Sequence, residues 1–161
     1  AWDDGWVTCA ANGPIRFDDK LFIYYSGIRR HGNDRTNPGG IGAATLRRDG
    51  FAALRCGGHG GDVMTEPVKV SAPKLLMNAA VFGAKMGAEI GNVRVRVVTD
   101  VEVLEGFTFE SCNGLVRDDQ TAFEVTWGPD RENLGRFVGK QVRLHIQADA
   151  PCNLYSYRFG N

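Results

Sequence analysis

Short segments of the chain alternate between apolar and polar residues, which is the pattern of β-strands that bury one face. In "NVRVRVVTD", residues 92–100, three valines face one way and the two arginines between them face the other. "VEVLEGFTFE" continues the alternation at residues 101–110, and the junction near Asp100 predicts a turn. These two segments are therefore expected to form a half-buried hairpin.

Two later segments repeat the alternation, "AFEVTWG" at 122–128 and "QVRLHIQA" at 141–148. Their apolar positions are expected in the core, Trp127 included, whereas His145 points outward. Breaks containing glycine or proline separate many such short segments. The last hundred or so residues are therefore predicted to be all-β, an antiparallel β-sandwich or jelly roll of the concanavalin-like or carbohydrate-binding-module-like kind.

Few segments of the sequence have the pattern of a helix. The best candidate is "PKLLMNAAVFGAKMG" at 73–87, which fits equally well as a strand that ends near Ala80 and is followed by a loop. A single helical turn within "DRENLGRFVG", residues 130–139, is the second candidate.

The first sixty residues follow another pattern. "LFIYYSG" at 21–27 is apolar on both alternating faces, which suits a strand covered on both sides. "IGAATLRRDGF" at 41–51 comes after a polar loop, so the two are predicted to be one hairpin of a sheet larger than itself. Residues 1–161 are thus expected to be a single sandwich domain with this hairpin, within residues 1–57, packed on it. The segment that covers the second apolar face of the strand at 21–27 is either absent from the chain or supplied by residues 1–17.

The balance of charged residues limits the classes of partner that the chain is expected to bind. Lysine plus arginine and aspartate plus glutamate both number 19 in 161 residues, so no net positive charge favours nucleic acid or an anionic membrane surface. We predict no nucleic acid and no membrane partner. A neutral partner fits better. The opening residues "AWDDGW" lack the layout of a signal peptide, so the chain is expected to be soluble, with any export signal already removed.

The four cysteines are Cys9, Cys56, Cys112 and Cys152, with no pair at zinc-binding spacing. They allow three full disulfide pairings, among which the sequence does not choose. Buried thiols in a reducing cytosol are the other interpretation.

Several phrases resemble a known family. "LFIYYSG", the polar loop and "IGAATLRRDGF" resemble the last propeller-blade hairpin of bacterial proteins related to glycoside hydrolase families 32 and 43. "KLLMNAAV", "VRVRVVTDVEVLEGFTFESCNGLVRDD", "FEVTWG" and "VGKQVRLHIQADAPCNLYSYRF" resemble the β-sandwich that follows such propellers. The resemblance implies a secreted or periplasmic sugar-cleaving propeller with a jelly roll beside it, of which residues 1–57 would hold a blade remnant.

The acidic motifs of that family cannot be carried over to this chain. "RRDGF" has Gly50 where the Arg-Asp-Pro motif needs proline, and Ser111 separates Glu110 from Cys112 in what would be the Glu-Cys motif. Catalysis by this chain alone is therefore not expected. A glycosidase needs two carboxyl groups about 5 to 9.5 Å apart, and the sequence favours no such pair.

A carbohydrate site needs an exposed aromatic platform edged by planar polar groups. The first candidates are Trp2 and Trp6, which sit in a polar opening segment, although core plugging or fraying of that segment would explain them too. The polar loop supplies the other ligand-binding candidates: Arg29, Arg30, His31, Asp34 and Arg35. An ordinary solvated loop is the alternative interpretation of that cluster.

A structural calcium is the one cofactor considered. Asp118 and Asp119 lie in an expected turn and could hold the ion with backbone carbonyls, as in many jelly-roll modules, or simply form an acidic turn.

Three functions follow from these observations. The first is a non-catalytic carbohydrate-binding accessory module of a glycan-degrading protein, with a polysaccharide as its partner. The second is a structural domain that braces a propeller glycoside hydrolase, docking on the catalytic propeller or on a second copy of itself. The third is a small glycoside hydrolase that acts on its own.

Overall fold

A computed structural model of the protein describes residues 1–10, 12–29, 39–82, 91–100, 102–149 and 151–161. The chain divides into two units, Ala1–Phe51 and Ala52–Asn161. The first unit contains β1 (Trp6–Cys9), β2 (Ile15–Phe17), β3 (Lys20–Ile28) and β4 (Gly39–Arg47). The second contains β5 (Leu54–Cys56), β6 (Gly61–Met64), β7 (Val68–Lys69), β8 (Lys74–Val81), β9 (Asn92–Val98), β10 (Cys112–Asn113), β11 (Leu115–Val116), β12 (Asp119–Trp127), a 3₁₀ turn at Gly135–Phe137, β13 (Gln141–Ala148) and β14 (Cys152–Gly160).

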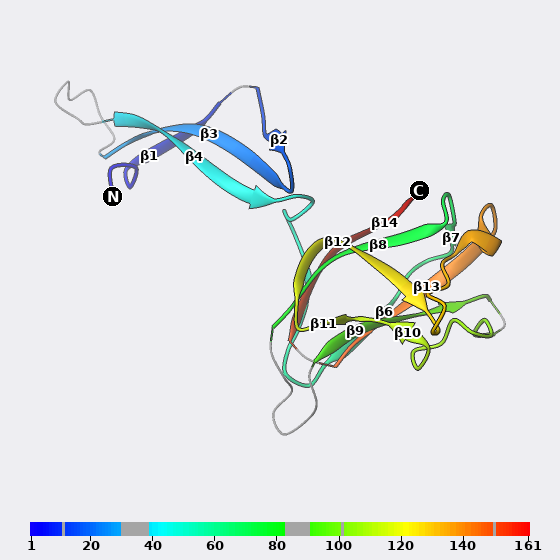
Figure 1. The fold of residues 1–161 in the computed structure, drawn as a ribbon. Coiled ribbons are helices and arrows are strands. Elements are labelled where there is room, and N and C mark those ends of the chain that lie inside the picture. The colour runs from blue at the N-terminus through cyan, green and yellow to red at the C-terminus, as the bar shows by residue number, and fades with distance from the viewer. Residues whose placement is uncertain (11, 30–38, 83–90, 101, 150) are drawn as a thin grey trace. The chain divides into compact units, whose positions relative to one another are not determined.

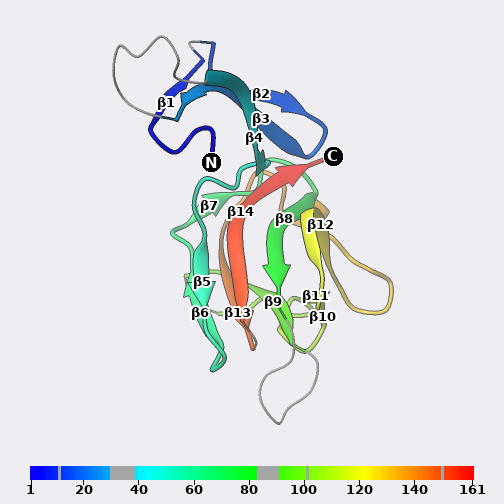
Figure 2. The same ribbon diagram turned by 90° about the vertical axis from the view of Figure 1, so that its left-hand side faces the viewer.

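The second unit is a β-sandwich, as the sequence predicts. One sheet has the order β10-β12-β8-β14-β5, and the other has β11-β9-β13-β6 with β7 also paired to β13. All the pairings between these strands are antiparallel. Figures 1 and 2 show the two sheets face to face, and Figure 2 shows β5 and β6 on the same side of the unit.

Period-two alternation builds the core between these sheets. Along β9 the burial alternates at every residue, with Val93, Val95 and Val97 inward and the arginines outward. The burial along β13 alternates in the same way. The largest fully buried side chains come from both sheets and from the segments that join them: Trp127, Phe107, Leu75, Met77, Leu115, Leu134, Leu144, Val70, Val95, Val97 and Val125. Each stabilises the fold by about 1.5–3 kcal/mol relative to an exposed position.

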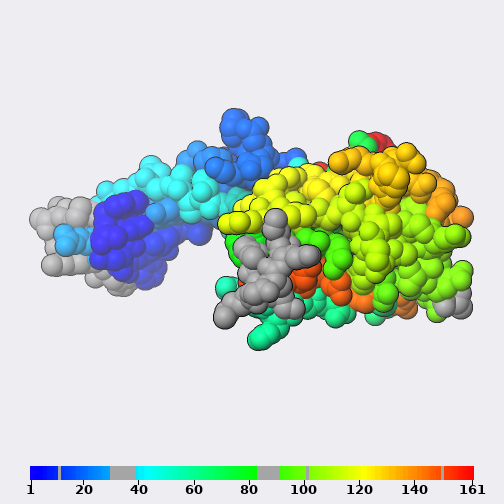
Figure 3. All heavy atoms as spheres, turned by 60° about the horizontal axis from the view of Figure 1, so that its bottom comes forward, coloured from blue at the N-terminus to red at the C-terminus, as the bar shows by residue number. Residues whose placement is uncertain are grey.

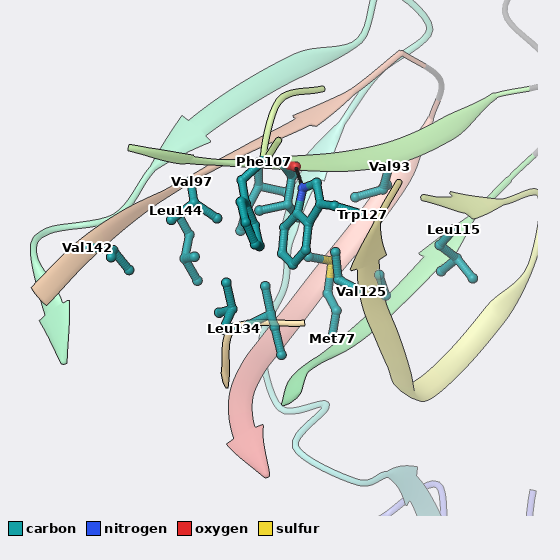
Figure 4. Packing of buried hydrophobic residues seen from close by; sticks show 14 of the residues in the cluster. Met77, Val93, Val97, Phe107, Leu115, Val125, Trp127, Leu134, Val142 and Leu144 are labelled. Carbon is teal, nitrogen blue, oxygen red and sulfur yellow. Dashed lines mark hydrogen bonds between the residues drawn. The ribbon is translucent and has the colours of Figure 1, made fainter. Parts of the chain in front are cut away.

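Trp127 lies at the centre of this core, as predicted (Figure 4). Its indole Nε1 donates a hydrogen bond of 2.8 Å to the carbonyl oxygen of Val95 in the opposite sheet. Its ring lies 4.9 Å from that of Phe107. The side chain therefore joins the two sheets by both apolar contact and a buried hydrogen bond.

Segments 104–110 and 130–140 lie side by side on the surface of the sandwich (Figure 3). Arg136 joins them, because its guanidinium donates to the Glu105 carbonyl at 2.9 Å and lies over the ring of Phe107. Phe137 meets the Phe107 ring edge-on at 5.0 Å. This clamp closes one end of the core over Phe107.

Part of the hairpin predicted for residues 92–110 is wrong. β9 forms as expected, but it pairs with β13 and β11, and residues 102–110 form no strand. One bridge joins Val98 to Val103, and Gly106 then takes a φ of 83° that breaks the extended run. The chain turns there, and Phe107 enters the core.

The two helix candidates are settled by the same structure. Residues 74–81 form β8, which confirms the strand alternative for this segment. Residues 83–90 lie outside the described part of the chain. The turn expected within 130–139 is the short 3₁₀ segment Gly135–Phe137. Among the described residues, no helix is long and apolar enough to span a membrane.

The first unit is a single antiparallel sheet. β3 is central, β1 and β2 share one of its edges, and β4 pairs along the other. The hairpin predicted for β3 and β4 is confirmed. Residues 1–17 mostly extend this sheet sideways through β1 and β2, whereas Trp2 stacks on the ring of Tyr25 at 5.8 Å. Of the described residues before β2, Trp2 and Asp3 lie against the face of β3 that carries Tyr25 and Gly27.

We expect Trp127→Phe to lower the free energy of unfolding by about 2 kcal/mol, because it loses volume and leaves the Val95 carbonyl without the indole donor. Trp6→Phe, at a half-exposed side chain, should change it by less than about 0.5 kcal/mol. Urea unfolding followed by circular dichroism measures both. Equal effects of the two substitutions would contradict the central role of Trp127.

Candidate functional site

The outward face of the sheet formed by β6, β9 and β13 carries the densest group of interacting polar side chains that we find in the described part of the chain. We call it the polar face. It is defined by the outward residues of these strands and the loops that touch them: Asp62, Arg94, Arg96, Phe109, Glu110, Arg143, His145, Gln147 and Asp149. The same alternation that buries the valines of β9 and the aliphatic residues of β13 places them there.

Arg96, His145 and Asp62 form a chain of hydrogen bonds across three strands. Arg96 Nε donates to His145 Nδ1 at 3.0 Å. Because arginine only donates, Nδ1 must accept, so the proton of a neutral imidazole is on Nε2. His145 Nε2 then donates to Asp62 Oδ2 at 2.8 Å. Each group is fixed by the next, so their planar polar edges are held in one arrangement.

Phe109 supplies an apolar surface beside this chain. The Arg96 guanidinium carbon lies 4.8 Å from the centre of the Phe109 ring, and the His145 ring meets it edge-on at 5.1 Å. Phe109 itself is partly exposed. The result is an aromatic ring with a guanidinium over one face and an imidazole against it edge-on, and the Asp62 carboxylate is bonded to the other side of that imidazole. A partly exposed ring with planar polar groups beside it suits the apolar face and hydroxyl edge of a sugar ring.

Strand register brings the polar residues together. His145 lies opposite Arg96 on one side and Met64 on the other, while Asp62 lies opposite Gln147. Gly60, with a φ of 75°, allows the turn before β6, because a Cβ there would lie 2.5 Å from the Ala148 carbonyl oxygen. A side chain at that position would push β6, and with it Asp62, away from β13.

Further ion pairs flank the central chain. Arg94 contacts Gln147 at 3.3 Å and Asp149 at 3.5 Å, and Asp149 also accepts a bond from the Asn92 amide at 2.6 Å. Arg143 contacts Glu66 and Asp100, each at 3.4 Å. Arginines and acids alternate, so the polar face presents donors and acceptors with little net charge.

The pKa of Glu110 is lowered from its usual value. A hydrogen bond from the Thr108 side chain is the largest cause, and the positive charges of Arg94 and Arg96 add to it. Glu110 therefore stays ionised to a lower pH than a free glutamate and provides acceptor oxygens at the border of the polar face.

This geometry favours binding over catalysis. Both nitrogens of His145 are engaged, one as acceptor and one as donor, so the imidazole has no nitrogen left to take a proton from a substrate. The carboxylates of Asp62 and Glu66 contact different residues of β13, His145 and Arg143. The face can hold hydroxyl groups through fixed donors and acceptors.

The structure places the aromatic candidates from the sequence in the first unit, away from these residues in the chain. Trp2 is 40% exposed and Trp6 is 50% exposed. Trp2 lies on the face of the sheet that carries Tyr25, whose hydroxyl donates to Asp3 Oδ2 at 2.7 Å. By the strand register, Trp6 lies on the opposite face, so the two tryptophans do not form one platform.

The polar-loop candidates are only partly described. Arg29 is exposed at the end of β3, and its charge contributes to the lowered pKa of Asp4, after the larger effect of the N-terminal amine. Arg30, His31, Asp34 and Arg35 lie outside the described residues.

Asp118 uses both carboxylate oxygens within its own turn. Oδ2 accepts a bond of 2.6 Å from the Gln120 amide and Oδ1 one of 2.8 Å from the backbone of Asp119. Within the described ranges, no three metal-binding side chains gather closely enough to hold an ion. The calcium site at Asp118 and Asp119 stays a prediction.

Sequence reasoning missed the central residues of the polar face. It placed His145 outward on its strand correctly but gave it no role, and it did not connect Arg96 with Asp62. The signal was present in the outward positions of "VRVRV" and "RLHIQ", which become neighbours only once β9 and β13 are paired. That pairing of distant strands was the missing information.

Comparison with known proteins identifies no relative. No family model, no curated protein and no solved structure matches the chain.

We expect Thr108→Val to raise the pKa of Glu110 toward 4.5, and Arg96→Gln to raise it by less, because the Thr108 bond is the larger cause. Since the folded pKa is depressed, the stabilising contribution of ionised Glu110 is present above its ordinary pKa and is lost as pH falls through the lowered value. Carboxyl ¹³C NMR against pH measures this directly. A Glu110 pKa at or above 4.5 in the unsubstituted protein would contradict the described contacts.

Proposed function

We propose that this chain is a non-catalytic accessory module that binds a polysaccharide or oligosaccharide through its polar face. The observation that carries the proposal is the fixed chain Arg96–His145–Asp62 beside Phe109. Planar groups held around an aromatic ring bind the hydroxyls of a sugar without requiring movement when the ligand arrives. The overall charge of zero agrees with a neutral ligand rather than with an anionic polymer.

The wider setting of this proposal comes from the resemblance of the sequence to the tails of propeller glycoside hydrolases. In that setting the module belongs to a secreted or periplasmic glycan-degrading protein and keeps the catalytic domain near its polymer. The residues that hold the ligand are those of the polar face. Trp2, Trp6 and Arg29, all in the other unit, are the competing candidates.

Native affinity electrophoresis against soluble polysaccharides tests the proposal. We expect retention by one class of polymer, no release of reducing sugar, and no change with EDTA. Arg96→Ala should weaken binding about tenfold, because it removes the group that orients His145 and lies over the ring of Phe109. Arg158→Ala, the same change of charge on an exposed residue of the other sheet, is the matched control and should bind normally.

Two results would contradict the polar face as the site. Trp2→Ala or Trp6→Ala could abolish retention while Arg96→Ala left it intact, which would move the site to the first unit. No retention by any polymer would end the binding proposal.

A second function is favoured by a surface of the first unit. One face of its sheet, the docking face, carries exposed apolar side chains that share it by strand register: Trp6, Ile15, Phe17, Tyr24 and Ile41. Their exposures run from 43% for Tyr24 to 84% for Ile41. In this unit Gly27 is the one described residue that is buried. A small open sheet needs an apolar partner for stability. We propose that this face braces a neighbouring β-structure, a propeller blade or a second copy.

Ile41→Lys tests the bracing role, because it places a charge at the most exposed position of the docking face without removing a buried group. We expect the unsubstituted chain to form dimers at micromolar concentrations in sedimentation velocity, and Ile41→Lys to remain monomeric. Val138→Lys, at a half-exposed valine of the sandwich, is the control and should still dimerise. A monomer at every concentration tested in all three proteins would argue against self-association through this face.

A further inference from the structure

The edge strand β5 brings two cysteines together. Cys56 on β5 lies directly opposite Cys152 on β14, and their Sγ atoms are 3.4 Å apart. Directly opposed residues of an antiparallel pair have Cα atoms about 4.5 or 5.5 Å apart. Both values fall within the roughly 4.4–6.8 Å that a disulfide requires. A bond between these two sulfurs therefore needs only side-chain rotation.

The other two thiols are placed differently. Cys9 is exposed on β1 in the first unit. Cys112 accepts a hydrogen bond of 3.2 Å from the Val95 amide, and burial raises its pKa to about 11. Burial raises the pKa of Cys152 as well, to about 12, so the protonation state does not separate these two thiols, and the 3.4 Å distance to Cys56 does. Of the pairs within the sandwich, the geometry selects Cys56 with Cys152.

The position of Cys56 and Cys152 indicates what a bond between them would do. β5 is held to β14 over three residue pairs, and it forms the edge of its sheet. Beside it an apolar hollow of about 470 Å³ opens between the two sheets, lined by Cys56, Cys152 and aliphatic residues of β6 and β13 such as Val63 and Ile146. A covalent link between residues 96 positions apart in the chain would hold this weakly paired edge in place.

We propose that Cys56 and Cys152 form a disulfide when the protein meets an oxidising thiol–disulfide environment. Cys56, the less buried of the two, attacks a small-molecule disulfide such as glutathione disulfide and releases one glutathione thiolate. Cys152 then displaces the second glutathione. One S–S bond forms in the protein and one breaks in the donor, while two protons and two electrons pass to the released thiols. This inference is independent of the proposed glycan binding.

The full-length chain tests the proposal after equilibration with glutathione disulfide. We expect the number of free thiols under denaturing conditions to fall from four to two. Tryptic digestion without reduction should then give the peptide that begins at Cys56 linked to the peptide that ends at Arg158. Four free thiols after oxidation, or a link from either cysteine to Cys9 or Cys112, would overturn the assignment.

A thermal measurement tests the role of the bond separately. A cross-link that closes a loop of about a hundred residues should raise the melting temperature of the sandwich by on the order of 10 °C over the reduced protein. Cys56→Ser should remove this dependence on reductant, and Cys9→Ser, the matched control at an exposed thiol, should keep it. If the Cys56→Ser protein still lost the same number of degrees on reduction, the stabilising role would be disproved.

Discussion

The polar face is a consequence of the alternation that builds the core, in which every second residue of a strand points inward and is apolar. Two sheets pack only if each turns one continuous apolar face toward the other, and Val93, Val95 and Val97 of β9 and the aliphatic residues of β13 meet that condition. The residues between them then point to the outer face of the sheet. Arg94 and Arg96 are driven to the same outer surface as His145 and Gln147, and the pairing of β9 with β13 aligns them. Trp127 holds this arrangement from inside, because its indole binds the backbone of Val95, between the two arginines.

The two units of the chain satisfy this constraint to different degrees. The sandwich buries both inner faces, whereas the first unit is one sheet with large apolar side chains exposed. A module with a closed core and a polar face can bind a ligand as it stands. A single sheet with an apolar docking face acquires its full stability from whatever covers it. The two proposed roles, ligand binding and bracing, therefore belong to different parts of the molecule and do not exclude one another.

The fold was predictable where one strand carries its own signal, and the site was not. Alternation identified the inward positions of β9, β12 and β13 and the burial of Trp127, since each depends on a few consecutive residues. It failed after Asp100, where the continued alternation suggested a strand but Gly106 turns the chain and sends Phe107 inward. It also could not show that the register of β14 shifts between Leu154 and Ser156, which lets Leu154, Tyr157 and Phe159 all reach the core. The hydrogen-bonded chain of the polar face depends on three strands distant in sequence, whose pairing no local pattern specifies.

The proposed binding role requires that the polar face holds a sugar ligand. Chemical-shift mapping by ¹H–¹⁵N NMR, with an oligosaccharide of whichever polymer retains the protein, tests that claim residue by residue. If the polar face is the binding site, the largest perturbations fall on the backbone of Arg96, Phe109 and His145 and on the side-chain nitrogens of Arg96 and His145. Perturbations centred on Trp2 and Trp6, or none at saturating ligand, would contradict it.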